Sequence, residues 1–135
     1  MGYWKNQSTI TAVDDSTLTA LYSGNTSTLD AGSRNLLTIY AEYTAQETTA
    51  YALIQIEAGF DSDNLFQINN LSSDSTGVST VKQGVFKIES GGIGTAVKRR
   101  IGVCLADVKF RISAKETVSS TFGTITLTVI KNEQS

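Results

Sequence analysis

Four segments of the chain alternate apolar and polar residues with a period of two. They span Leu37–Tyr43, Ala52–Ala58, Val108–Lys115 and Thr124–Val129. Such alternation is typical of a β-strand with one buried and one solvated face, because successive side chains of a strand point to opposite sides. In the first two segments the apolar faces consist of Leu37, Ile39, Ala41 and Tyr43, and of Ala52, Ile54, Ile56 and Ala58. The pattern predicts antiparallel sheets, each packed on one side against another layer.

Weaker patterns add further short strands around these four. We expect strands at Thr17–Tyr22, Asn64–Asn70 and Val85–Glu89, and a strand or a buried connection at Thr95–Val103. Clusters of Gly, Ser, Asp and Asn separate the segments, and no stretch has the 3.6-residue apolar period of a helix. About seven to nine short strands with regular turns predict an all-β fold, a single antiparallel β-sandwich of jelly-roll type.

The length of 135 residues predicts one domain. Residues 1–15 are expected to form an extended N-terminal arm, residues 16–131 the β-sandwich and residues 132–135 a short polar tail. Thr and Ser account for 33 of the 135 residues. Because Thr is common on strand surfaces, this composition also favours an all-β protein.

The composition excludes several classes of chemistry. The chain has no His, which removes most metal sites and nearly every Ser–His or Cys–His catalytic arrangement. Its single Cys104 lies in an apolar run and is expected to be a buried thiol. The net charge is −2, which offers no general attraction to nucleic acid. We therefore expect no enzyme activity, no cofactor, no metal and no nucleic-acid partner.

The hydropathy pattern bears on localisation. No segment has the length of a membrane span, and the first residues lack the apolar stretch of a signal peptide. We therefore expect synthesis in a reducing cytoplasm and no membrane partner.

The succession of strands resembles a known family. The segments concerned are Asn35–Thr44, Leu53–Gln67, Val108–Thr117 and Phe122–Ile130. They resemble small jelly-roll virion proteins of tailed bacteriophages. In those proteins a strand ending in Tyr-Thr leads to a strand ending in an acidic turn, and a late Arg-Ile-Ser-Ala-Lys-Glu-like strand precedes a Gly-containing hairpin. The resemblance covers roughly residues 35–130, and Gly84–Leu105 departs from it.

This resemblance implies a structural role in the virion, namely a capsid decoration (cement) protein that binds the shell and stabilises it. It also implies a homotrimer, the major capsid protein or another virion protein as partner, and location in the virion after synthesis in the host cytoplasm. A neck, tail or fibre component is one alternative. A carbohydrate- or receptor-binding β-sandwich module is another, with Tyr40, Tyr51 and Phe60 as its candidate aromatics. A cellular β-sandwich with no viral role is the third.

Two short segments are candidates for contact with a partner. Tyr3, Trp4 and Lys5 place two large aromatic residues in the polar arm, where they either fold back onto the sandwich or anchor the arm on a partner. The basic cluster Lys98-Arg99-Arg100 is either a solvated strand end or loop, or an ionic contact with an acidic capsid or neighbouring surface. Nucleic-acid contact is a third interpretation, although three charges without stacked aromatics make a small footprint.

Three further motifs have ordinary structural interpretations. Asp61–Asn64 begins like a Ca²⁺ loop but lacks the later Gly and Glu of an EF-hand, so it is either a solvated turn or a weak divalent-cation site. Two of the three residues Glu57, Asp61 and Asp63 could form the paired acid and base of a glycosidase, but we expect these carboxylates to be solvated at strand ends. Gly91–Gly94 is expected to be a flexible turn, since no helix follows it.

Overall fold

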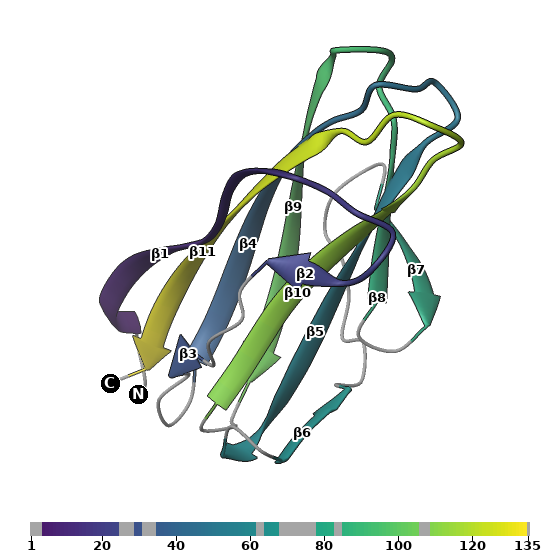
Figure 1. Cartoon of the computed structure of the whole chain (residues 1–135). Helices are drawn as coiled ribbons and strands as arrows, with labels where there is room; N and C mark the ends of the chain where they lie inside the picture. The colour runs from purple at the N-terminus through teal and green to yellow at the C-terminus, as the bar shows by residue number, and fades with distance from the viewer. Residues whose placement is uncertain are drawn as a thin grey trace.

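The computed structural model describes residues 4–24, 29–30, 35–61, 64–67, 78–82, 85–105 and 109–134 (Figure 1). Within these residues the strands are β1 (Trp4–Thr17), β2 (Ser23–Gly24), β3 (Leu29–Asp30), β4 (Asn35–Thr44), β5 (Tyr51–Asp61), β6 (Asn64–Gln67), β7 (Val78–Lys82), β8 (Val85–Glu89), β9 (Ala96–Leu105), β10 (Lys109–Thr117) and β11 (Thr124–Gln134). The described part of the chain contains no helix, and thus none long and apolar enough to cross a membrane.

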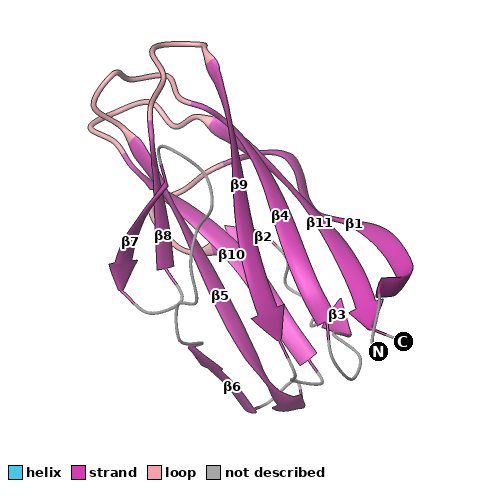
Figure 2. Cartoon of the chain, turned by 180° about the vertical axis from the view of Figure 1, so that it is seen from behind, coloured by secondary structure: helices cyan, strands magenta, loops and turns pink. Residues whose placement is uncertain are grey.

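Strands that are distant in sequence are neighbours in two antiparallel sheets (Figures 1 and 2). The first sheet has the order β1-β11-β4-β9. The second has the order β2-β10-β5-β8-β7, with β3 also paired to β10 and β6 also paired to β5. The chain therefore passes repeatedly from one sheet to the other, because β4, β9 and β11 lie in the first sheet and β5, β8 and β10 in the second.

The two sheets enclose one hydrophobic core, which confirms the expected β-sandwich. From the first sheet, β4 contributes Leu37, Ile39, Ala41 and Tyr43, and β11 contributes Ile125, Leu127 and Val129. From the second sheet, β5 contributes Ala52, Ile54, Ile56 and Ala58, β8 contributes Phe86 and Ile88, and β10 contributes Phe110, Ile112 and Ala114. These are the apolar faces that the period-two alternation predicts, and the strand expected at Thr95–Val103 is present as β9.

The N-terminal segment differs from the expected arm. Instead of an extended arm over residues 1–15, the chain forms β1, which pairs with β11 from Trp4 to Thr17. Its pairing register shifts between Thr11 and Val13 and again between Val13 and Ser16. These irregularities interrupt the period-two alternation, which explains why the sequence pattern did not predict the strand. At the other end β11 continues to Gln134, so most of the expected polar tail is strand as well.

Three other segments can be compared with the predicted strands. The strand expected at Thr17–Tyr22 is a connection after Thr17, which is the last residue of β1. In this connection the Leu18 amide donates to the Gly123 carbonyl, and the Thr19 carbonyl accepts from the Glu116 amide. The strand expected at Asn64–Asn70 is present as β6 over Asn64–Gln67, and its last three residues lie outside the described residues. The short strand β7 has no counterpart among the predicted elements.

Loops gather at one end of the sandwich, where the structure describes them throughout. The β4–β5, β8–β9 and β10–β11 connections (residues 45–50, 90–95 and 118–123) lie together at the top of Figure 1 and form what we call the loop end. The Gly94 amide donates to the Ala45 carbonyl at 2.8 Å, and the Ser90 amide donates to the Ala50 carbonyl at 3.1 Å. Gly92 and Gly94 have positive φ angles of 116° and 68°, so the Gly91–Gly94 segment is a turn as expected.

Candidate functional site

The residues expected to contact a partner fall on the two edges of the first sheet. Trp4 and Lys5 belong to β1, while Lys98, Arg99 and Arg100 belong to β9, and the sheet order places these two strands at opposite edges. Tyr3 lies outside the described residues, and only the backbone of Trp4 and Lys5 is described. The structure therefore brings the two candidate segments onto one sheet but not into one site.

The two segments also lie at different heights along that sheet. Trp4 pairs with Gln134, whereas the strand position of Lys98 corresponds, through Glu42, to Thr126. Thr126 and Gln134 are eight residues apart on β11. At a strand rise of roughly 3.3 Å per residue, this separates the two positions by about 26 Å along the strand.

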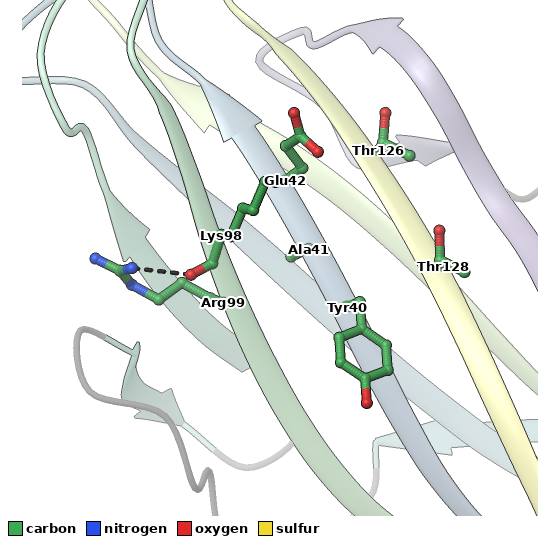
Figure 3. A pocket seen from close by; sticks show the side chains of 7 residues that line it. All are labelled: Tyr40, Ala41, Glu42, Lys98, Arg99, Thr126 and Thr128. Atoms are coloured by element: carbon green, nitrogen blue, oxygen red, sulfur yellow. Dashed lines mark hydrogen bonds between the residues drawn. The ribbon is translucent and has the colours of Figure 1, made fainter.

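The three residues of the basic cluster have different orientations. Lys98 is exposed and lies opposite Glu42, and Arg100 is exposed and lies opposite Tyr40, so both are on the outer face. Arg99 lies opposite the buried Ala41, and its side chain extends from β9 on the side away from β4 (Figure 3). Its Nη1 donates to the Lys98 carbonyl at 2.9 Å, and its Nε is buried without a hydrogen-bond partner in the described part of the chain.

A hollow of about 200 Å³ opens on the outer face of the first sheet (Figure 3). Its rim consists of the side chains of Tyr40 and Glu42 on β4, Thr126 and Thr128 on β11, and Lys98 on β9, and Ala41 and Arg99 complete the lining. We call it the Tyr40 hollow. It combines an aromatic ring that is 44% exposed, two hydroxyl groups, a carboxylate and an ammonium group.

Strand pairing sets the positions of these five side chains. Tyr40 and Glu42 are two residues apart on β4 and therefore project from the same face. Tyr40 lies between Thr128 and Arg100, and Glu42 lies between Thr126 and Lys98. The side chains of the hollow thus come from two adjacent rows of paired residues that run across β11, β4 and β9. None of them lies on a loop.

A second hollow, of about 350 Å³, lies near the loop end on the second sheet. Thr48, Thr49, Ala50, Tyr51, Lys87, Glu89 and Ser90 line it, and we call it the Tyr51 hollow. Its charged groups already interact, since Lys87 Nζ lies 4.3 Å from the centroid of the Tyr51 ring and 3.6 Å from Glu89 Oε1. One face of the aromatic ring is therefore covered by the ammonium group.

The titratable groups with the largest pKa shifts lie at the loop end. The carboxylate of Glu47 accepts hydrogen bonds from the hydroxyl and backbone amide of Ser119, from those of Ser120, and from the amide of Thr121, at distances between 2.6 and 3.1 Å. These bonds, that of the Ser119 hydroxyl first, hold the pKa of the Glu47 carboxyl well below its usual value. Glu47 thus fastens the β10–β11 loop to the β4–β5 loop.

A second carboxylate at the loop end is buried. Glu116 is only 2% exposed, and it accepts hydrogen bonds from the Tyr43 hydroxyl and, at 2.7 Å, from the Gly123 amide. Burial, followed by the hydrogen bond to Glu116, raises the pKa of the Tyr43 phenol far above its usual 10. Clusters of shifted groups are often catalytic. Here the bonds link strand β4 to β10, strand β10 to the β10–β11 loop, and that loop to the β4–β5 loop, so the cluster positions the loop end.

Of the remaining acidic candidates, the structure shows the partner of Glu57. Glu57 lies opposite Arg111 on the outer face of the second sheet, and Arg111 Nη2 is 2.6 Å from Glu57 Oε1. Ser62 and Asp63 lie outside the described residues, so the Asp61–Asn64 motif and the acid pair with Asp63 do too. The side chain of Cys104 also lies outside them. Within the residues that are described, no group of three acidic or thiol side chains could hold a metal ion.

Sequence patterns gave different amounts of information about these sites. Glu116 continues the inward positions Phe110, Ile112 and Ala114, so its burial could have been inferred from period-two alternation. Nothing in the sequence relates Glu47 to Ser119, because they meet only through the packing of two loops. Of the candidate aromatics, Phe60 is 64% exposed at the end of β5 and borders neither hollow.

Comparison with protein-family models, with curated protein sequences and with solved structures finds no match to this chain.

Proposed function

We propose that this chain is a jelly-roll structural protein of a tailed-phage virion, and specifically a capsid decoration protein that acts by binding rather than by catalysis. The observation that carries the proposal is the strand order. In a jelly roll, eight strands form two sheets in which the first strand pairs with the last and successive Greek keys cross between the sheets. The order β1-β11-β4-β9 facing β2/β3-β10-β5-β8 fits that scheme.

The edge strands supply the means of binding. An edge strand presents backbone donors and acceptors to a neighbouring chain. On this sheet one edge begins with Trp4 and Lys5, and the other contains Lys98, Arg99 and Arg100. We propose that the basic edge contacts an acidic surface of the major capsid protein or another virion protein, and that the start of β1, with Tyr3, contacts a second neighbour. A molecule held at both edges bridges two subunits of the shell.

Assembly as a homotrimer would strengthen this binding. Each edge contact can be weak, because three linked copies raise the effective concentration of the second and third contacts. The binding free energy stabilises the assembled shell and not its separated subunits. The chain would therefore be made in the host cytoplasm and act in the virion.

The test adds purified protein to particles that were produced by a phage lacking the gene for this chain. We expect the protein to sediment with the particles and to raise the temperature at which they release DNA. The variant Arg99→Glu reverses a charge at the basic edge and should bind less, whereas Lys87→Glu on the other sheet should bind like the wild type. Light scattering should give a mass near three times 14.5 kDa over a tenfold dilution.

Two results would argue against a decoration role. If mass spectrometry finds the chain only in isolated tails, it is a neck, tail or fibre component. If complete particles contain none of it, the chain has no structural role in the virion.

A further inference from the structure

Most polar side chains at the rim of the Tyr40 hollow have no hydrogen-bond partner among the described residues. The side chains of Tyr40, Glu42 and Thr128 make no hydrogen bond or ion pair within the described part of the chain, and neither does the ammonium group of Lys98. Thr126 differs, because its Oγ1 accepts a hydrogen bond from the Asp15 amide at 2.9 Å. This bond leaves the Thr126 hydroxyl proton available as a donor.

These unused groups define the chemistry of a ligand. An exposed aromatic face favours a flat apolar surface, and a phenol, two hydroxyls, a carboxylate and an ammonium group together offer both donors and acceptors. The Arg99 guanidinium extends away from β4 and donates to the Lys98 carbonyl, so the charges at the rim of the hollow are those of Glu42 and Lys98. These two charges are opposite, which favours a neutral ligand over an anion or a cation. A neutral molecule with an apolar face and many hydroxyl groups is a sugar ring.

The size of the hollow agrees with this chemistry. Sites for drug-sized ligands usually enclose roughly 300–1,000 Å³. The Tyr40 hollow, with about 200 Å³, is suited to a single ring. Because its side chains project from three paired strands, their spacing is set by the sheet before any ligand binds, which limits the entropy lost on binding.

The Tyr51 hollow provides an internal contrast. It also has a tyrosine, hydroxyl groups, a lysine and a glutamate. There, however, the lysine covers the ring and pairs with the glutamate, so the same residue types are engaged with one another. The contrast favours ligand binding at the hollow whose tyrosine, carboxylate and ammonium group have no partner among the described residues.

From these observations we propose that the Tyr40 hollow binds one neutral hexopyranose unit, with the apolar face of the sugar on the Tyr40 ring. Hydroxyl groups of the sugar donate to the Glu42 carboxylate and accept from the Lys98 ammonium group, while Thr126 and Thr128 contact its edge. Tyr40, Glu42, Thr126 and Thr128 lie on the two inner strands of the sheet, whereas Lys98 and Arg99 on β9 also belong to the basic edge. Sugar binding at the hollow does not rest on the proposed virion role.

The test is a titration of isotopically labelled protein, followed by the backbone amide signals in NMR spectra. The probes are the methyl glycosides of glucose, galactose, mannose and N-acetylglucosamine at millimolar concentrations, together with an array of immobilised neutral glycans. We expect at least one probe to shift the amide signals of Tyr40, Glu42, Lys98, Thr126 and Thr128. Binding found on the array alone, with the same dependence on Tyr40, supports the site for a sugar unit within a longer glycan.

Matched variants decide whether the hollow is responsible. Tyr40→Ala should weaken binding at least about tenfold, whereas Tyr40→Phe keeps the ring and should retain most of the affinity. Tyr51→Ala removes the tyrosine of the other hollow and should bind like the wild type. Thermal unfolding of each variant separates lost binding from lost folding. The proposal is overturned if none of the four glycosides and no glycan on the array binds, or if Tyr40→Ala binds as well as the wild type.

Discussion

The loop end and the Tyr40 hollow are both rich in polar side chains, but they use them in opposite ways. At the loop end, the carboxylates of Glu47 and Glu116 accept hydrogen bonds from strand β4 and from the β10–β11 loop. At the hollow, the carboxylate of Glu42 and the ammonium group of Lys98 face one another across two strands without any such bond in the described residues. Hydroxyl groups are abundant in both places.

The difference separates polar groups that stabilise the fold from polar groups that can bind a ligand. A buried carboxylate must be hydrogen-bonded, because burial without partners costs several kcal/mol. Glu116 meets this requirement within the fold and has little capacity left for a ligand. A polar group on an outer sheet face is solvated by water instead, and it can exchange that water for a ligand. Changes at the two regions should therefore have separable effects on stability and on binding.

A large effect on stability is expected for Glu116→Ala. The change leaves the Tyr43 hydroxyl and the Gly123 amide without their acceptor, at roughly 1–3 kcal/mol for each buried group. We expect the free energy of unfolding to fall by about 3 kcal/mol in urea titrations. Glu89→Ala is the control, because that side chain is 75% exposed. A loss below about 1 kcal/mol for Glu116→Ala would mean that the buried cluster is not structural.

A smaller loss is expected for Gly123→Ala, which tests how closely the two loops pack. An added Cβ would collide with the Thr44 carbonyl oxygen and lie 2.9 Å from the Ala45 Cα, so the backbone must move. We expect a loss of about 2 kcal/mol, as for other overpacked sites. Gly102→Ala on β9 is the control, since its Cβ would meet nothing within 4 Å. Equal stability of the two variants would contradict the close contact.

The Glu47 carboxylate should stabilise the folded state only at pH values at which this group is also ionised in the unfolded chain. Because the pKa is lowered in the folded state, the contribution is present above about pH 4.3 and is lost as the pH falls further. Glu47→Gln should therefore have a flatter profile of melting temperature between pH 6 and pH 3 than the wild type. Glu42→Gln, which changes a carboxylate without these donors, should retain the wild-type profile. Parallel melting-temperature profiles for Glu47→Gln and the wild type would contradict a stabilising role for the ionised Glu47 carboxylate.

The smallest effect on stability is expected for Tyr40→Ala. This tyrosine is on the outer face of β4, and cross-strand contacts of such residues contribute roughly 0.2–1 kcal/mol. The same substitution at Tyr43, on the opposite face of the same strand, removes a fully buried ring and should cost about 3–5 kcal/mol. Differential scanning calorimetry of the two variants measures this contrast. A large loss for Tyr40→Ala would show that the hollow has a structural role.

Local alternation was sufficient to predict most strands and the core. The inward residues of β4, β5 and β8 could be read from the sequence, because a strand exposes every second side chain to the core whatever its neighbours are. Pairing partners could not be read in the same way. In β1, shifts of register around Val13 interrupt the alternation, and only pairing with β11 shows that the segment is a strand and not an arm.

The candidate sites depended on packing to a greater degree. Lys98, Arg99 and Arg100 are conspicuous in the sequence, but their separate orientations follow from the pairing of β9 with β4. Tyr40, Glu42, Thr126 and Thr128 are ordinary outward residues of two strands far apart in the chain, and they share a hollow only because β11 inserts between β1 and β4. The alternation of side chains is a local property of each strand, whereas the neighbours across a sheet are chosen by the burial of the whole core.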